Sequence, residues 1–201
     1  MTTFTAYIKK QQRRDDPLGD FSKDFVYILK NHPNYPQCRG TDTIVSETLL
    51  GHYKFLPNYA QQRDNILEAL CGLWREWLEY KHIGLKFNQP KRGYIYFFRL
   101  PQKQNVFKIG RTLSEPKKRM ASVSARERTD LEIHDWIRID HYDIIEKELH
   151  NAFHSSRLMR EWFEVSTNEI DEAIRIYCLT DSEAEVYSIL REEEEYDGRF
   201  S

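Results

Sequence analysis

The stretch of sequence that decides the fold is residues 93–100, which read Gly-Tyr-Ile-Tyr-Phe-Phe-Arg-Leu. Aromatic and β-branched residues dominate this stretch, as is typical of a strand that is buried on both faces. A polar turn over residues 101–105 follows it, and a second apolar stretch, residues 106–109, stops at Gly110. This order predicts a β-hairpin that opens a folded domain.

Beyond the hairpin, helical and strand-like patterns alternate. Ser114 is a candidate N-cap and Pro116 suits a first helical turn, so a helix is expected from there to about Ala125. The later expected elements are a strand over 131–139, a helix over 142–153, a strand over 162–165, a helix over 166–179 and a last helix opened by a capping box at 180–183. This order predicts an α+β domain whose small antiparallel sheet is flanked by helices.

Before the hairpin, every periodic segment is helical. The expected helices lie around Phe4, after a cap at Asp20, over 45–53 and over 61–80. Trp74 and Trp77 lie on the apolar face of the longest one, and we expect both in the core. The composition then changes, so the expected divisions are a helical accessory domain over 1–82, a linker over 83–92, an α+β domain over 93–179 and an acidic C-terminal helix or tail over 180–201.

The charge of the chain is unevenly distributed. Of its 201 residues, 30 are Lys or Arg and 32 are Asp or Glu, a net charge of −2. Residues 1–90 hold 12 basic and 10 acidic side chains, residues 91–160 hold 15 and 9, and residues 161–201 hold 3 and 13. The balances are therefore +2, +6 and −10. The near-neutral total hides a basic middle segment that could bind an anionic partner.

Several classes of protein are excluded by composition. No apolar run approaches the roughly 18 residues of a membrane helix, and the N-terminus lacks the basic-then-apolar pattern of a signal peptide. Cys38, Cys71 and Cys178 are far apart and odd in number, so they form neither a disulfide framework nor a zinc knuckle. These features predict a protein of the reducing cytoplasm with no membrane partner.

Five separated motifs occur in order between residue 93 and about residue 165. A Tyr-Ile-Tyr motif ends at Tyr96, a Lys-Ile-Gly motif ends at Gly110, a basic helix start contains Arg119, a later helix carries Glu146, and a Leu-His…Glu-Trp-Phe pattern closes the set. Together they resemble the GIY-YIG nuclease superfamily, in the branch whose second motif reads Lys-Ile-Gly. The resemblance implies a metal-dependent DNA endonuclease of a phage, mobile-element or bacterial defence setting.

The same resemblance implies a role for each motif residue. Tyr96 activates or positions the attacking water, and Lys108, which stands where the superfamily has its second tyrosine, orients water or contacts phosphate. Arg119 stabilises negative charge on the phosphate, for which a planar guanidinium is suited. Glu146 is implied to be the direct ligand of one Mg²⁺ or Mn²⁺ ion, since such ions bind through few carboxylates.

These residues also have plain structural interpretations. Tyr96 could be an ordinary core tyrosine, and Tyr94 is the residue most easily confused with it. A shift of one residue in strand register would move the hydroxyl to the opposite face of the sheet. Arg119 lies in a basic run that could be a solvated helix face. Glu148 lies about 200° around the helix from Glu146, so both cannot serve one site, and we assign Glu146.

Other residues near the motifs are expected to bind double-stranded DNA or to support the site. The expected phosphate contacts are Arg111, Thr112, Lys117, Lys118, Arg126 and Arg128. Gly110 would permit close backbone approach or a positive φ, and Glu161 would support the reacting residues through side-chain contacts. His150 could support them in the same way or could simply be packed, and we favour packing.

Residues 1 to about 80 resemble the YozE-like helical domains of the SAM-like type. The matching positions are Phe4, the helix entry at Gly19-Asp20, Asp24, the turn at Pro36 and the helix end at Trp77-Leu78. The resemblance implies a helical bundle that could bind a protein partner.

Two alternatives to an endonuclease remain open. Lys108 in place of the second motif tyrosine favours a nucleic-acid-binding module with weak or no catalysis. The acidic end over 180–201 favours an interaction protein that binds a basic partner or covers its own basic site.

Overall fold

A computed structural model describes residues 3–31, 48–53, 56, 63–83 and 92–187. The chain divides into two compact units, which are residues 1–89 together with 148–155, and residues 90–147 together with 156–201. The expected turn at Pro36 lies outside the described residues. The expected α+β class is confirmed, because helices precede a six-stranded antiparallel sheet with flanking helices.

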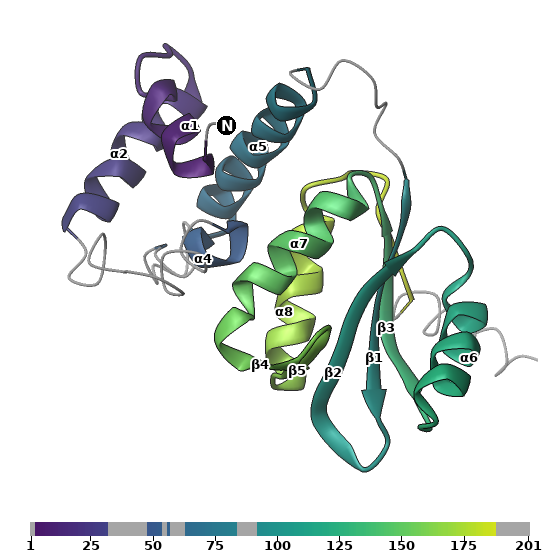
Figure 1. Cartoon of the computed structure of the whole chain (residues 1–201). Helices are drawn as coiled ribbons and strands as arrows, with labels where there is room; N and C mark the ends of the chain where they lie inside the picture. Colours follow the sequence, from purple (N-terminus) through teal and green to yellow (C-terminus); the bar gives the residue numbers. More distant parts are fainter. Residues whose placement is uncertain (1–2, 32–47, 54–55, 57–62, 84–91, 188–201) are drawn as a thin grey trace, which may run out of the picture. The chain divides into compact units, whose positions relative to one another are not determined.

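The first unit is helical (Figure 1). Its described helices are α1 (Phe4–Gln11), α2 (Pro17–Asn31), α4 (Leu49–Tyr53) and α5 (Arg63–Ile83). The ring of Phe4 lies 4.9 Å from that of Trp74, which lies 4.7 Å from that of Trp77. Trp74 and Trp77 are buried, with 0% and 3% of their surfaces exposed. The prediction that both tryptophans pack in the core is confirmed.

The start of α2 differs from the expected cap at Asp20. The helix begins three residues earlier, and the Asp16 carboxylate accepts a hydrogen bond of 2.8 Å from the backbone N–H of Gly19. Pro17 explains the earlier start, because proline has no N–H to leave unsatisfied and its fixed φ suits the first helical turn. Asp20 therefore lies within the first turn and not at the cap.

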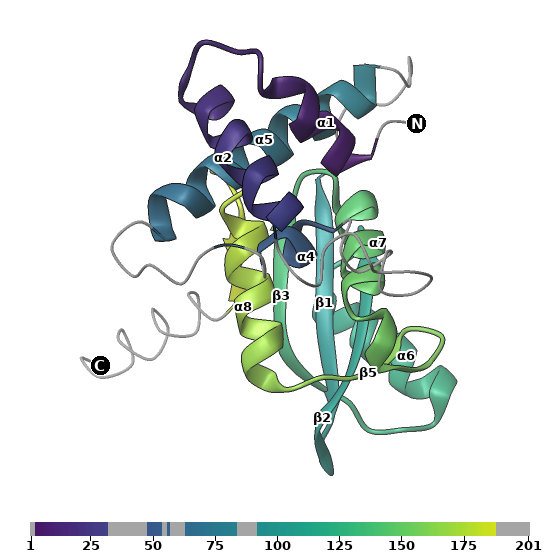
Figure 2. The same ribbon diagram turned by 90° about the vertical axis from the view of Figure 1, so that its left-hand side faces the viewer.

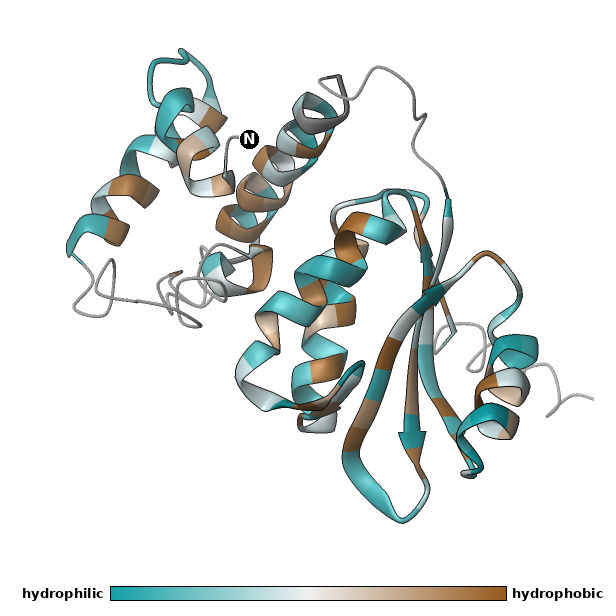
Figure 3. Ribbon diagram, viewed as in Figure 1, coloured by the Kyte–Doolittle hydropathy of each residue, from teal (hydrophilic) through white to brown (hydrophobic). Residues whose placement is uncertain are grey.

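The second unit is built on one sheet with the strand order β4-β5-β2-β1-β3-β6, in which every neighbouring pair is antiparallel. The strands are β1 (Gly93–Leu100), β2 (Lys103–Thr112), β3 (Glu132–Ile139), β4 (Arg157–Met159), β5 (Trp162–Glu164) and β6 (Glu185–Val186). Figure 3 shows hydrophobic residues along the middle of the strands, whereas the tip of the β1–β2 hairpin is hydrophilic.

Three boundaries in this unit were predicted wrongly. Strand β2 begins at Lys103 and ends at Thr112, where a turn over 101–105 and a strand that stops at Gly110 were expected. Residues 180–184 form turns, and Glu185–Val186 then pairs with β3 as an edge strand, so no helix begins at the expected capping box at 180–183. Helix α6 (Pro116–Glu127) begins after Glu115 and not after Ser114. The Ser114 side chain instead bonds to that of Thr112, at 2.7 Å between the hydroxyl oxygens, which occupies it in the loop before the helix.

The register of β1 and β2 divides the functional residues between the two faces of the sheet. Tyr96 lies opposite Gly110 and Phe98 lies opposite Lys108. Because side chains alternate along a strand, these residues share one face, which we call the tyrosine face. Arg111 follows Gly110 and therefore lies on the other face, which we call the arginine face.

Helices cover the two faces unequally. Figures 1 and 2 show α6 on one side of the sheet, and α7 (Tyr142–Ala152) and α8 (Thr167–Cys178) on the other. An ion pair of α6 with Lys108 places α6 on the tyrosine face. The first turns of α7 lie on the arginine face, because the ring of Tyr142 packs against Gly93 and Glu146 pairs with Arg111.

Close approach explains the glycine at position 110. A β-carbon added to Gly110 would lie 2.4 Å from the hydroxyl oxygen of Tyr96 and 2.6 Å from its ring carbon Cζ. Real Cβ atoms do not come this close, so the buried tyrosine ring requires a glycine on the neighbouring strand. Of the two uses expected for Gly110, close backbone approach is the one that the structure contains.

We expect Gly110→Ala to lower the free energy of unfolding by about 1–3 kcal/mol, the usual cost of overpacking a core. In the Tyr96→Leu protein, the same Gly110→Ala change should lower the free energy of unfolding by less than it does in the unsubstituted protein, because the clashing ring is gone. Urea denaturation of the four proteins measures this coupling. Additive losses would contradict the proposed clash. Gly72→Ala is the matched control, since its β-carbon would meet only Leu18, at an ordinary 3.5 Å.

Candidate functional site

Tyr96 is the most buried member of the candidate site, with 1% of its surface exposed. Its ring stacks on that of Phe98 at 4.1 Å, and its hydroxyl lies over the backbone of Gly110. Burial raises the pKa of Tyr96 above the ordinary value of 10.0, although a hydrogen bond and the positive charge of Arg119 act in the opposite direction. The phenol is therefore neutral at physiological pH and can donate a hydrogen bond.

Arg119 extends from the first turn of α6 toward Tyr96, whose pKa its charge and hydrogen bond lower. The Nε atom of Arg119 is buried and has no hydrogen-bond partner among the residues that the structure describes. A buried donor without a partner costs free energy, and an anion that approaches the guanidinium would remove that cost. This unsatisfied N–H beside a tyrosine hydroxyl is the clearest ligand-binding feature of the tyrosine face.

Lys108 is buried between two carboxylates on the same face. Its side chain is 3% exposed, and its Nζ lies 2.9 Å from an oxygen of Glu127 and 3.1 Å from one of Glu161. The ammonium also lies 5.3 Å from the centre of the Trp162 ring. The indole N–H of Trp162 donates to Glu127 at 3.0 Å. A buried cation is tolerated only with such partners, so this cluster ties α6 and β5 to the centre of the sheet.

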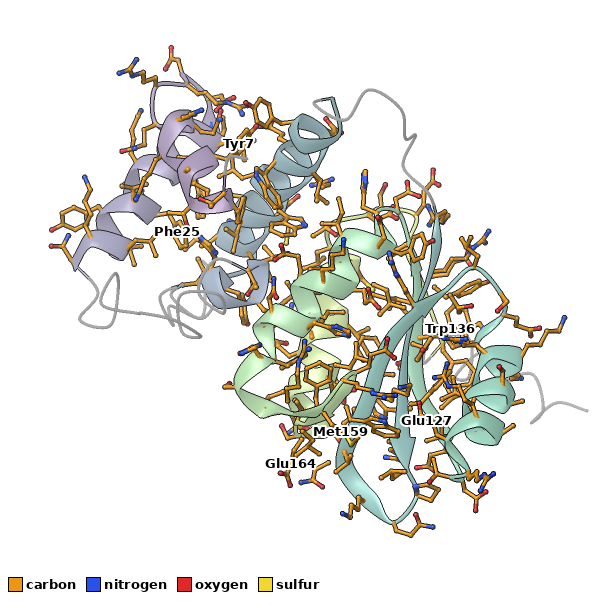
Figure 4. All side chains as sticks on the ribbon, viewed as in Figure 1. Tyr7, Phe25, Glu127, Trp136, Met159 and Glu164 are labelled. Carbon is orange, nitrogen blue, oxygen red and sulfur yellow. The ribbon has the colours of Figure 1, made fainter. Side chains whose placement is uncertain are left out.

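Glu127 is a site residue that sequence reasoning missed. It is the last residue of α6, and Figure 4 labels it on the side of the sheet that α6 covers. Burial opposes its ionisation, but hydrogen bonds from Lys108, Arg126 and Trp162, together with the charge of Lys108, hold the pKa of Glu127 below its ordinary value. Its Arg-Glu-Arg context in the sequence is typical of a solvated helix end, so only the tertiary contact with Lys108 identifies it.

Glu146 lies on the arginine face, away from the tyrosine that sequence reasoning paired with it. Its carboxylate is 3.2 Å from Nε of Arg111, and Asp143, one helical turn earlier, is 3.9 Å from the same guanidinium. Arg111 also lies over the ring of Tyr142, at 5.8 Å. Two carboxylates and one cation thus form a compact ionic cluster at the start of α7, and Asp143 is a second residue that the sequence did not single out.

The structure therefore brings together only part of the expected site. Tyr96, Lys108, Arg119 and Glu161 gather on the tyrosine face, and Gly110 makes room for the tyrosine. Glu146 lies across the sheet with Arg111, while His150 is one turn further along α7 and half-buried. The remaining expected contacts lie near the two ends of α6: Thr112, Lys117, Lys118, Arg126 and Arg128.

The described residues hold no group of three or more His, Cys, Asp or Glu side chains that could enclose a metal ion. A magnesium ion does not need such a group, because it binds through one or two carboxylates and keeps several waters. Asp143 and Glu146 have this donor chemistry, and both already lie around a cation, the Arg111 guanidinium. Within the described part of the chain, no helix combines the length and hydrophobicity that crossing a bilayer requires.

The Glu127–Lys108 pair predicts a loss of stability in acid. Because folding lowers the pKa of Glu127 from 4.5, its stabilising effect is present above about pH 4.5 and is lost as the pH falls through the lowered pKa. Glu127→Gln should therefore show a smaller fall in urea midpoint between about pH 6 and pH 3.5 than the unsubstituted protein. Glu115→Gln, which removes an exposed carboxylate from the start of α6, should keep the full fall. Equal falls in all three proteins would contradict the prediction.

Comparison with known proteins finds a similarity to one domain family over part of the chain. No curated protein and no solved structure is significantly similar to the chain. Residues 93–178 match the T5orf172 domain, and this range runs from the start of β1 to the end of α8. It contains both the Tyr96–Arg119 pair and the Arg111–Glu146 pair, so the candidate site lies wholly within the segment that is similar to the T5orf172 domain.

Proposed function

We propose that the T5orf172 domain of this protein binds DNA through its phosphates and hydrolyses phosphodiester bonds at the tyrosine face. The observation that carries this proposal is the buried, unsatisfied Nε–H of Arg119 beside the hydroxyl of Tyr96. An anion with several acceptor oxygens suits such a donor, and a phosphate group also suits the basic character of the segment. The endonuclease resemblance supports the choice of a phosphodiester over other anions.

In this proposal, Arg119 binds a non-bridging oxygen of the scissile phosphate. The guanidinium stabilises the negative charge that accumulates there as water attacks, because it is always ionised and is held within a partly buried site. Tyr96 is neutral, so it positions the water or the phosphate through its O–H and does not itself remove a proton. Glu161 is the more exposed of the two carboxylates that pair with Lys108, with 41% of its side chain accessible against 24% for Glu127.

Lys108 acts as a positioning residue in this scheme. Its ammonium is 3% exposed and bound by two carboxylates, so it does not project into solvent to meet a substrate. It neutralises Glu127 and Glu161 and thereby keeps an anionic substrate from being repelled by them. This role explains how lysine can replace a tyrosine in the second motif without leaving an unsatisfied side chain.

A divalent cation, Mg²⁺ or Mn²⁺, is the cofactor that we propose, with Glu146 as its ligand and Asp143 as a second donor. When bound there, such an ion would supply positive charge to a phosphate group on the arginine face, and not to the phosphate that Arg119 binds. Both carboxylates lie on the arginine face, across the sheet from Tyr96. The roles of Arg119 and Tyr96 therefore do not depend on this ion.

A binding module with weak or no catalysis is the second candidate. The specific observation in its favour is the separation of Glu146 from Tyr96 by the sheet, together with the 1% exposure of Tyr96. A domain that binds phosphates through Arg119 and the basic residues of α6 needs neither an accessible tyrosine nor a metal ligand. The proposed partner in both cases is DNA, and a protein partner for the helical unit remains a prediction from resemblance.

Arg119→Ala should abolish nicking of supercoiled plasmid DNA in Mg²⁺ or Mn²⁺, with a loss of at least about a hundredfold in rate, because it removes the charge at the transition state. Lys147→Ala removes an exposed charge from α7 and should retain the rate. The assay separates the two candidates. Binding without nicking by the unsubstituted protein selects the binding module, and equal nicking by Arg119→Ala contradicts both roles of this arginine.

Glu146→Ala tests the proposed metal ligand. If Glu146 holds the ion, the variant should need a higher Mn²⁺ concentration for half-maximal nicking, or lose activity at every concentration. Glu148→Ala, two residues along the same helix, should leave the metal dependence unchanged. Unchanged activity and metal dependence in Glu146→Ala would remove this residue from the reaction.

A further inference from the structure

Three non-glycine residues of the described chain adopt positive φ angles: Arg128 at 53°, His141 at 55° and Arg160 at 49°. Left-handed backbone is unfavourable for residues with a β-carbon, and glycine or asparagine relieves the cost. Two of the three positions are arginines whose side chains are exposed and form no ion pair with the described residues. Ion pairs of these side chains within the described part of the protein therefore do not offset the unfavourable free energy of the left-handed backbone.

Each arginine lies where a glycine would be expected on geometry alone. Arg128 ends α6 in the left-handed conformation, with its N–H and that of Thr129 both bonded to the carbonyl oxygen of Ser124. Glycine is the commonest residue at this helix-ending position. Arg160 lies in the tight turn between β4 and β5, where glycine also avoids the steric cost.

The buried lysine brings these two distant positions to the same edge of the tyrosine face. Arg128 follows Glu127 and Arg160 precedes Glu161, and both glutamates bind Nζ of Lys108, at 2.9 and 3.1 Å. The charges of Lys108 and Glu161 also act on the Tyr96 hydroxyl. Each of the two exposed arginines therefore adjoins, in the chain, one carboxylate of the Lys108 cluster next to the candidate site.

We propose that Arg128 and Arg160, the flanking arginine pair, bind backbone phosphates of DNA beside the phosphate held by Arg119. This inference rests on the proposed function and names two contacts that hold the duplex next to the scissile bond. Arginine suits the task because its planar fork can bind two phosphate oxygens and its charge is permanent. The left-handed backbone at Arg128 and Arg160 then lowers the stability of the protein, and in return it keeps two arginines available for DNA binding.

The test compares stability and DNA affinity in the same variants. Arg128→Gly and Arg160→Gly should each raise the Tm by a few degrees, because they relieve the left-handed backbone. Both should weaken binding of a fluorescent DNA duplex, measured by anisotropy in EDTA so that no cleavage occurs. A phosphate contact contributes about 0.9 to the slope of log K against log salt. For the variant that carries both Arg128→Gly and Arg160→Gly, the magnitude of this slope should therefore decrease by about 1.8.

Two controls separate charge from strain. His141→Gly changes the third left-handed position and should leave DNA affinity and salt slope unchanged. Lys147→Ala removes an exposed charge from α7, on the other side of the sheet, and should also leave the slope unchanged. Arg128→Asn and Arg160→Asn tolerate the left-handed conformation, so they must reproduce the binding loss even if a glycine variant folds poorly.

The outcomes distinguish this inference from the function on which it rests. Binding by the unsubstituted protein, with unchanged affinity and slope in the Gly and Asn variants, overturns the flanking arginine pair and leaves the proposed function standing. An equal slope loss in Lys147→Ala also overturns it, since the effect would then be general charge. No DNA binding by the unsubstituted protein overturns the proposed function and the pair together.

Discussion

The buried ammonium of Lys108 is the interaction on which the arrangement of the second unit depends. A lysine at 3% exposure must be paired, and its partners come from the end of α6 and from the turn before β5. Through these two bonds, one side chain of a central strand holds the end of α6 on the tyrosine face and ties it to the turn before the neighbouring strand β5. The Trp162 indole, bonded to Glu127, closes the cluster. The candidate site is thus a product of charge pairing as much as of apolar packing.

Steric constraint complements this charge pairing two residues further along β2. The ring of Tyr96 occupies the space above Gly110 that any β-carbon would fill. The tyrosine hydroxyl is held there next to Arg119, and its ring stacks on that of Phe98. Burial keeps the phenol neutral, so its chemistry is that of a hydrogen-bond donor. A rigid donor beside an unsatisfied guanidinium suits recognition of a phosphate in both candidate functions.

The two faces of the sheet carry different parts of the expected chemistry. Arg119 and Tyr96 lie with α6, whereas Glu146 and Arg111 lie with α7. Alternation along β2 makes this separation unavoidable once Gly110 faces the tyrosine, because Arg111 is the next residue. The ionic cluster at the start of α7 is therefore a separate feature of the same segment, residues 93–178, that matches the T5orf172 domain. The binding-module alternative draws its support from this division.

The sequence by itself determined the local elements and the residue types of the site. The aromatic run at 93–100, Pro116 and the capping box at Ser166 predicted β1, α6 and α8, because strand composition and helix capping are local properties. It also predicted that Tyr96, Arg119 and Glu146 carry the chemistry, but not that a sheet lies between them. The tertiary structure alone decided which residues meet: Glu127 with Lys108, and Asp143 with Arg111. The physical reason is that pairing across a sheet depends on strand register and on which face each helix covers, and neither is encoded in the spacing of single motifs.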